Sequence, residues 1–133
     1  MKRDDWLDRL WETIDAHKFI AFEYGVHDCC TFVATCLDAM HGSERLKKIL
    51  VEYHDEKTAK ALIKSKDGML GVVEYFLGKS KPPHAARRGD PVLVESLKGT
   101  IVGICIGDAI VCAGDGVETY PLHLSRAAWC IDG

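Results

Sequence analysis

The stretch Gly25-Val26-His27-Asp28-Cys29-Cys30-Thr31-Phe32-Val33, residues 25–33, joins a turn to the start of a helix. Apolar residues continue beyond the turn with the spacing of one helix face: Phe32, Val33, Cys36, Leu37 and Met40. Asp28 is typical of a helix N-cap, and Gly42 is typical of the residue at which a helix ends. The sequence therefore predicts a helix between these two residues, with Cys29 in its first turn.

More helices are predicted on both sides of this one. Before it, apolar residues recur at helical spacing, with both tryptophans expected on the buried side: Trp6, Leu7, Leu10, Trp11 and Ile14. Residues 19–24 form an apolar stretch that we expect to be extended. Residues 43–78 are charged and helix-favouring, and they predict two or three short helices.

The character of the chain changes after the breaker Lys79-Ser80-Lys81-Pro82-Pro83. Short β-prone runs separated by Gly and Asp cover residues 91–95, 100–107, 109–113, 117–120 and 128–131. Helices first and closely spaced strands after them predict an α+β fold with a small antiparallel sheet or partial barrel. We expect residues 1–133 to form a single domain, because neither half is long enough to build an independent core.

Composition excludes several classes of partner. The formal net charge of -3 gives no basic field that would attract nucleic acid. No apolar run approaches the roughly 20 residues that span a bilayer, and the charged N-terminus lacks the pattern of a signal peptide. We therefore expect no membrane span, synthesis in a bacterial cytoplasm and six reduced cysteines, of which Cys36, Cys105 and Cys112 act as small hydrophobes.

Cys29 has the position of a nucleophile. A helix N-terminus presents unpaired N–H groups and a partial positive charge. Both lower the pKa of a thiol, and the N–H groups are donors for an oxyanion. Asp28 is expected to hold this turn in place as the helix N-cap.

Three motifs resemble those of the NlpC-type, papain-like cell-wall cysteine peptidases. Asp28-Cys29-Cys30-Thr31-Phe32-Val33 matches the family's Asp-Cys-Ser-Gly-Phe-Val at four of six positions. Arg88-Gly89-Asp90-Pro91-Val92-Leu93-Val94 is similar to its Gly-Asp-Leu-Val strand opening. Val102-Gly103-Ile104-Cys105-Ile106-Gly107 is similar to its Val-Gly-Ile-Tyr-Ile-Gly strand. The resemblance implies a papain-like fold with Cys29 as the nucleophile.

The same resemblance places no general base where the family has one. The family's histidine directly precedes Val-Gly-Ile, and Ile101 stands at that position, while the third polar residue falls near Cys112. Isoleucine cannot accept a proton, and a cysteine hydrolase needs an imidazole within hydrogen-bond reach. His27, His84 and His123 are the remaining candidates for a base, although Asp28 and the turn give His27 a structural role as well.

A metal site is a second chemical option. Its four nitrogen and sulfur ligands would come from His27, Cys29, Cys30 and one of the strand cysteines Cys105, Cys112 and Cys130. The chain has no Cys-x-x-Cys pair and no repeated ligand spacing. We therefore expect no cofactor.

The resemblance implies three functions that stay open. Divergent NlpC-like chains of this size resemble small proteins encoded among the tail genes of bacteriophages and gene-transfer particles. The first function is a structural component of a tail tip or baseplate hub, partnered by other tail proteins and incorporated in the virion tail. The second is a hydrolase of peptidoglycan peptides that uses Cys29 with an unusual base. The third is a binding module whose groove holds a peptide or a neighbouring chain.

Overall fold

The structure, a computed structural model, describes residues 1–132. This part of the chain contains five α-helices: α1 (Trp6–Ala16), α2 (Cys29–His41), α3 (Arg45–Glu52), α4 (Glu56–Ser65) and α5 (Met69–Leu77). Five strands follow: β1 (Pro91–Ser96), β2 (Gly99–Cys105), β3 (Ala109–Gly114), β4 (Gly116–Pro121) and β5 (Ser125–Ala128). Two short 3-10 helices, η1 (Pro83–Ala85) and η2 (Leu122–Leu124), precede β1 and β5. The predicted α+β class is confirmed.

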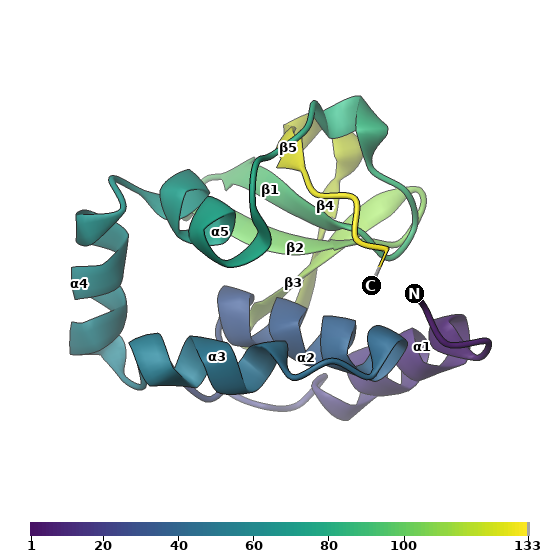
Figure 1. The fold of residues 1–133 in the computed structure, drawn as a ribbon, viewed down its shortest axis with the longest axis horizontal. Coiled ribbons are helices and arrows are strands. Elements are labelled where there is room, and N and C mark those ends of the chain that lie inside the picture. Colours follow the sequence, from purple (N-terminus) through teal and green to yellow (C-terminus); the bar gives the residue numbers. More distant parts are fainter. Residues whose placement is uncertain (133) are drawn as a thin grey trace.

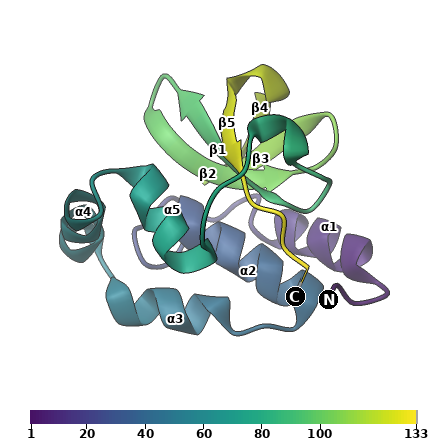
Figure 2. The same cartoon turned by 45° about the horizontal axis from the view of Figure 1, so that its top comes forward.

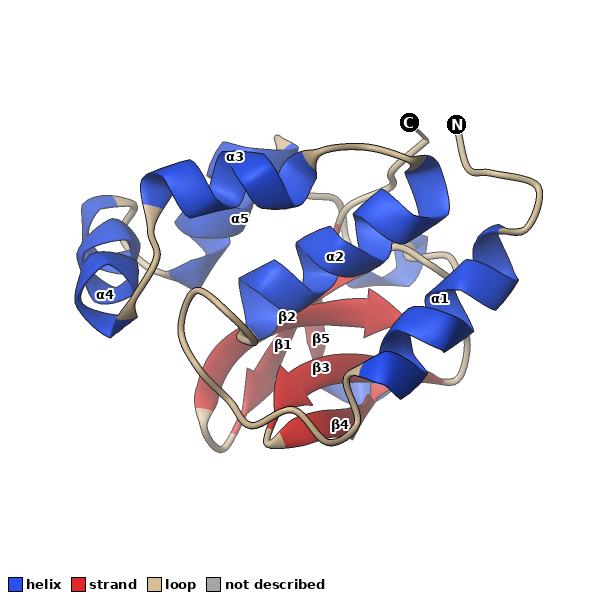
Figure 3. Ribbon diagram, turned by 90° about the horizontal axis from the view of Figure 1, so that it is seen from below, coloured by secondary structure: helices blue, strands red, loops and turns tan. Residues whose placement is uncertain are grey.

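The five strands form one antiparallel sheet in the order β4-β3-β2-β1-β5. Successive hairpins join β1 to β4, and the chain then crosses back so that β5 pairs with the outer side of β1. The α-helices lie on one side of this sheet, with α2 crossing it and α1 and α3 beside α2 (Figures 1 and 3). The two ends of the described chain, Met1 and Asp132, lie close together (Figure 2).

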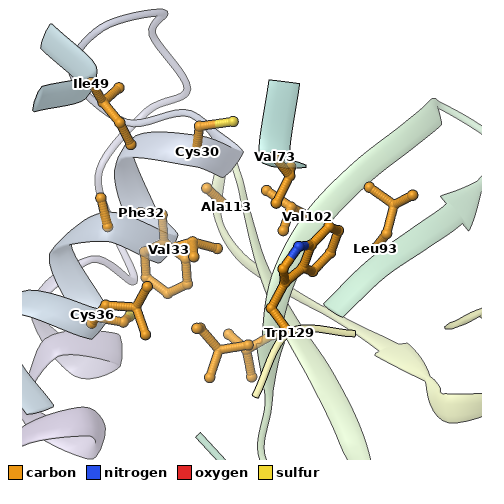
Figure 4. Close-up of a cluster of buried hydrophobic side chains, with 14 of the residues drawn as sticks. Cys30, Phe32, Val33, Cys36, Ile49, Val73, Leu93, Val102, Ala113 and Trp129 are labelled. Carbon is orange, nitrogen blue, oxygen red and sulfur yellow. The ribbon is translucent and has the colours of Figure 1, made fainter. Parts of the chain in front are cut away.

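The main core lies between α2 and the sheet. Phe32 and Val33 of α2 are buried with Val102 of β2 and Trp129 after β5, and Figure 4 shows their side chains meeting between the two layers. The indole Nε1 of Trp129 donates a 2.9 Å hydrogen bond to the carbonyl of Gly78, which ties the chain's last segment to the end of α5. The layers are therefore joined by both packing and hydrogen bonding.

A second apolar cluster covers the other face of the sheet. It consists of alternate strand residues, as the side-chain period of two requires: Val92, Val94, Cys105, Ile110, Cys112 and Ala128. Leu124 of η2 and Ala86 beside η1 pack against it. The prediction that Cys105 and Cys112 serve as small buried hydrophobes is confirmed, as it is for Cys36 in the main core.

Local signals located most of the elements correctly. Asp28 caps α2, Gly42 ends α2 with a φ of 70°, and residues 43–78 form three short helices. Asp90 is buried and accepts a hydrogen bond from the backbone N–H of Arg87 at 2.8 Å. Such a contact stabilises the turn into β1.

Two predictions about the fold are wrong. Trp11 is 44% exposed, because Leu10 and Ile14 define the buried stripe of α1 and Trp11 lies outside it. The last strand is Ser125–Ala128 and not residues 128–131, whose apolar side chains pack in the core beyond the strand.

The described chain, residues 1–132, contains no helix long and apolar enough to cross a membrane.

Replacement of Phe32 by alanine should lower the free energy of unfolding by about 3–5 kcal/mol, because it leaves a cavity between α2 and the sheet. Phe19→Ala is the matched control and should change stability by less than about 0.5 kcal/mol, since its ring is exposed. Urea denaturation followed by circular dichroism measures both. Equal losses for the two variants would contradict the assigned core.

Candidate functional site

The first turn of α2 is held by a reciprocal cap. The Asp28 carboxylate accepts a hydrogen bond from the Thr31 N–H at 2.9 Å, and the Thr31 hydroxyl accepts one from the Asp28 N–H at 2.9 Å. The two bonds satisfy N–H groups that a helix start leaves without partners. This cap fixes the direction in which Cys29, the first residue of α2, enters the site.

The same carboxylate ties together segments that are distant in sequence. Gly25 N–H donates to Asp28 Oδ2 at 2.8 Å, and the Tyr53 hydroxyl donates to Asp28 Oδ1 at 2.6 Å. Asp28 is 3% exposed, so its charge depends on these donors in place of water. Burial and the neighbouring acidic groups raise the pKa of Tyr53, which keeps its proton on the hydrogen bond to Asp28.

Cys29 lies in a pocket of about 190 Å³ between α2, α4, α5 and the strands. Its thiol is half-buried. The lining is mostly apolar: Phe22, Tyr24, Asp28, Cys29, Cys30, Tyr53, Ala59, Leu62, Ile63, Met69, Val72, Lys98, Thr100, Ile101 and Ala113. Because most of the lining is apolar, a negative charge that develops on the Cys29 sulfur must be stabilised by nearby protein donors.

Those donors exist for the Cys29 sulfur. A hydrogen bond from the Cys30 thiol lowers the pKa of Cys29, and the backbone N–H of Val102 adds to the effect. The pKa of Cys30 is raised for the converse reason, because it keeps the shared proton in a buried environment. The pair therefore has one sulfur disposed to ionise and one that retains its proton.

The described lining of this pocket contains no histidine. His27 is 1% exposed and its Nε2 lies 2.7 Å from the carbonyl oxygen of Gly116, so its ring faces β4. His84 and His123 are exposed in η1 and η2, outside the pocket lining. The structure does not bring any of the three base candidates to the Cys29 pocket, and Ile101 occupies the pocket wall instead.

His27 has a structural environment. Its ring stacks on His17 with centroids 5.4 Å apart and meets the edge of Phe32 at 6.0 Å. His17 is half-buried as a result, while His54 is exposed. His41 is half-buried at the end of α2.

The metal alternative on strand cysteines has no geometric support. Within residues 1–132, no three His, Cys, Asp or Glu side chains lie close enough together to hold a metal ion. Cys105 and Cys112 belong to the cluster on the opposite face of the sheet from α2, whereas Cys30 belongs to the main core. Because side chains alternate between the two faces of a strand, Cys105 and Cys112 lie on the face away from Cys30.

Three participants were missed by sequence reasoning. Tyr53 follows α3 and reaches Asp28 across 25 residues of sequence. Met69 begins α5, and its sulfur lies 3.9 Å from Cys30 Sγ. Val102 contributes through its backbone N–H. Of these three, only Tyr53 has a local sequence signal: it is an aromatic residue with a polar hydroxyl directly after a helix, where such a side chain often finds a hydrogen-bond partner.

The fold and site define an α+β domain in which a cysteine starts the central helix and faces an antiparallel sheet. The family model described as "Domain of unknown function (DUF6950)" matches residues 1–131. The chain therefore belongs to the DUF6950 family. A search of the curated proteins gave no match.

Tyr53→Phe should lower the free energy of unfolding by about 1.5–3 kcal/mol, because a buried carboxylate loses a donor that water cannot replace. Tyr24→Phe is the matched control, since Tyr24 lines the same pocket but is not among the described donors to Asp28. Urea denaturation of both variants is the measurement. Equal free energies of unfolding for Tyr53→Phe and Tyr24→Phe would contradict the claim that the Tyr53 hydroxyl stabilises the buried Asp28 carboxylate.

Alkylation of Cys29 by iodoacetamide should persist below the ordinary thiol pKa of about 8.5, because only the thiolate reacts and the pKa of Cys29 is lowered. The rate should fall only as the pH drops through this lowered pKa. Cys30→Ala removes the thiol donor and should move the midpoint to higher pH. Mass spectrometry of the native protein assigns the modified residue.

The half-buried Cys130 is the internal control for this experiment. Its alkylation profile should be the same in the wild type and in Cys30→Ala. An unchanged Cys29 midpoint in Cys30→Ala would show that Cys30 does not stabilise the Cys29 thiolate.

Proposed function

We propose that this domain is a degenerate NlpC-type, papain-like fold that serves as a structural component of a phage-type tail tip or baseplate hub. The observation that carries the proposal is the Cys29 pocket, whose described lining holds a cysteine at a helix N-terminus and no imidazole. The arrangement of a helix-starting cysteine against an antiparallel sheet supports the papain-like part of the proposal. Ile101 in the pocket wall supports the loss of hydrolysis.

The chemistry of peptide cleavage explains why the missing imidazole matters. A thiolate can attack a carbonyl, but the amine that leaves must receive a proton from a general acid. Three proton donors of the pocket lining are engaged elsewhere: Cys30 donates to Cys29, Tyr53 donates to the buried Asp28, and the Lys98 ammonium is paired with Glu118 at 2.7 Å. The lowered pKa of Cys29 therefore supplies the nucleophile but not the general acid that peptide cleavage also requires.

An exposed apolar segment supports contact with other proteins of an assembly. Phe19 and Val26 are 97% and 61% exposed, and Ile20 and Phe22 are 38% and 40% exposed. Phe22 also lines the Cys29 pocket, so the segment borders its mouth. Contiguous exposed apolar residues of this kind mark protein interaction surfaces. Other tail or baseplate proteins are the proposed partners.

The second candidate is a peptidoglycan peptide hydrolase, and the stabilised thiolate of Cys29 is the observation that favours it. It requires a base brought by a neighbouring chain, because His27, His84 and His123 lie outside the described pocket lining. The two functions differ in one respect that experiment resolves: only the hydrolase depends on the sulfur of Cys29.

Cys29→Ser should leave particle assembly and titre unchanged in a strain that produces particles containing this chain, because serine preserves the helix start. The charge-introducing double variant Phe19→Asp/Phe22→Asp should reduce the amount of the chain in purified particles, measured by quantitative mass spectrometry, since it disrupts the exposed apolar segment. Leu97→Asp is the control, because Leu97 is fully exposed in the β1–β2 turn.

Purified particles that contain the wild-type chain and particles that contain Cys29→Ser should release the same products from peptidoglycan peptides. Cleavage that depends on Cys29, together with particles that assemble but lose infectivity in Cys29→Ser, would replace the structural role with the hydrolase. Absence of the chain from purified particles would reject the tail role.

A further inference from the structure

Three sulfur-containing residues line the Cys29 pocket together. Cys29, Cys30 and Met69 all line this pocket. Cys30 Sγ lies 3.9 Å from Met69 Sδ, and Cys29 is the neighbouring residue in the first turn of α2. The Cys30 side chain points from α2 toward α5 (Figure 4), the helix that Met69 begins. Two thiols and a thioether from two helices therefore share one small volume.

The one measured separation between these sulfurs fits a known coordination geometry. Metal–sulfur bonds to a d10 ion are about 2.3 Å long. Three sulfurs at 120° around such an ion lie about 4.0 Å from one another, which is the bond length multiplied by the square root of three. The separation of 3.9 Å between Cys30 and Met69 fits one edge of this triangle.

We propose that Cys29, Cys30 and Met69 form a three-sulfur binding site for a soft monovalent cation, Cu(I). Thiolate and thioether ligands select Cu(I), and a three-coordinate site satisfies this ion. Zn²⁺ requires four ligands, usually with imidazole or additional thiolates. The oxygens of Asp28, the nearest carboxylate on the chain, already accept hydrogen bonds from Gly25, Thr31 and Tyr53.

Charge and access are also suited to the ion. Binding converts Cu⁺ and two thiols into a bis-thiolate complex and releases two protons, so the complex carries a net charge of about minus one. The N-terminus of α2 and the Val102 N–H stabilise this negative charge. Cys29 is half-buried at the pocket wall, so the ion enters without unfolding the core.

This site differs from one built on the strand cysteines. Its third ligand is a thioether, and it needs neither Cys105 nor Cys112, which pack on the opposite face of the sheet. It also goes beyond the proposed role in a tail. Copper binding tests the sulfur cluster alone and stays the same whether the domain is a structural part or a hydrolase.

The experiment is a Cu(I) titration of the full-length protein under anaerobic conditions with a non-thiol reductant and a chromophoric Cu(I) chelator as competitor. The wild type should bind one Cu(I) per chain. Met69→Leu, which keeps the side-chain volume, should weaken binding by more than about tenfold, and Cys29→Ser and Cys30→Ser should weaken it further. Cys130→Ser and Met40→Leu are the thiol and thioether controls and should bind like the wild type.

Several results would overturn the site. Wild-type affinity in Met69→Leu would show that the thioether is not a ligand, and an equal loss in Cys130→Ser would show unspecific thiol binding. X-ray absorption at the copper edge of the wild-type complex gives an independent readout. Three sulfur neighbours at about 2.3 Å are expected, and two neighbours or any nitrogen neighbour would reject the three-sulfur site even if a variant failed to fold.

Discussion

The buried carboxylate of Asp28 is the interaction on which the geometry of the site depends. It accepts hydrogen bonds from the loop at Gly25, from the first turn of α2 at Thr31 and from Tyr53 beyond α3. A charge that is 3% exposed would be costly without such donors. Three segments that are separate in sequence must therefore meet at one point, and their meeting places Cys29 at the wall of the pocket.

The six cysteines show how strongly position controls the chemistry of one functional group. Burial without a donor raises the pKa of Cys36 in the main core and of Cys112 on the other face of the sheet. The pKa of Cys29 is lowered instead, because the Cys30 thiol and the backbone N–H of Val102 stabilise its thiolate. The reactive sulfur is thus defined by the helix start and by β2 together, and neither element would produce it alone.

Sequence reasoning succeeded where the deciding interaction is local. The cap at Asp28, the helix end at Gly42 and the first four strands depend on neighbouring residues, and they were located within one or two positions. It failed where the interaction is distant. Tyr53 and Met69 lie 25 and 39 residues from their partners, so no spacing rule finds them. Trp11 was misplaced because the periodicity of α1 admits two neighbouring stripes, and only packing against α2 selects one.

The absence of an imidazole from the described pocket lining determines which chemistry the cysteine pocket can support. An imidazole near Cys29 would bring a positive charge and a mobile proton, and both favour acyl transfer. Ile101 brings neither, and it leaves an apolar wall beside adjacent thiols and a thioether. Hard cations and charged substrates lose their hydration in such a site without compensation, whereas a soft cation gains sulfur ligands that water cannot match. The apolar wall at Ile101, which weakens the case for hydrolysis, therefore strengthens the case for sulfur coordination.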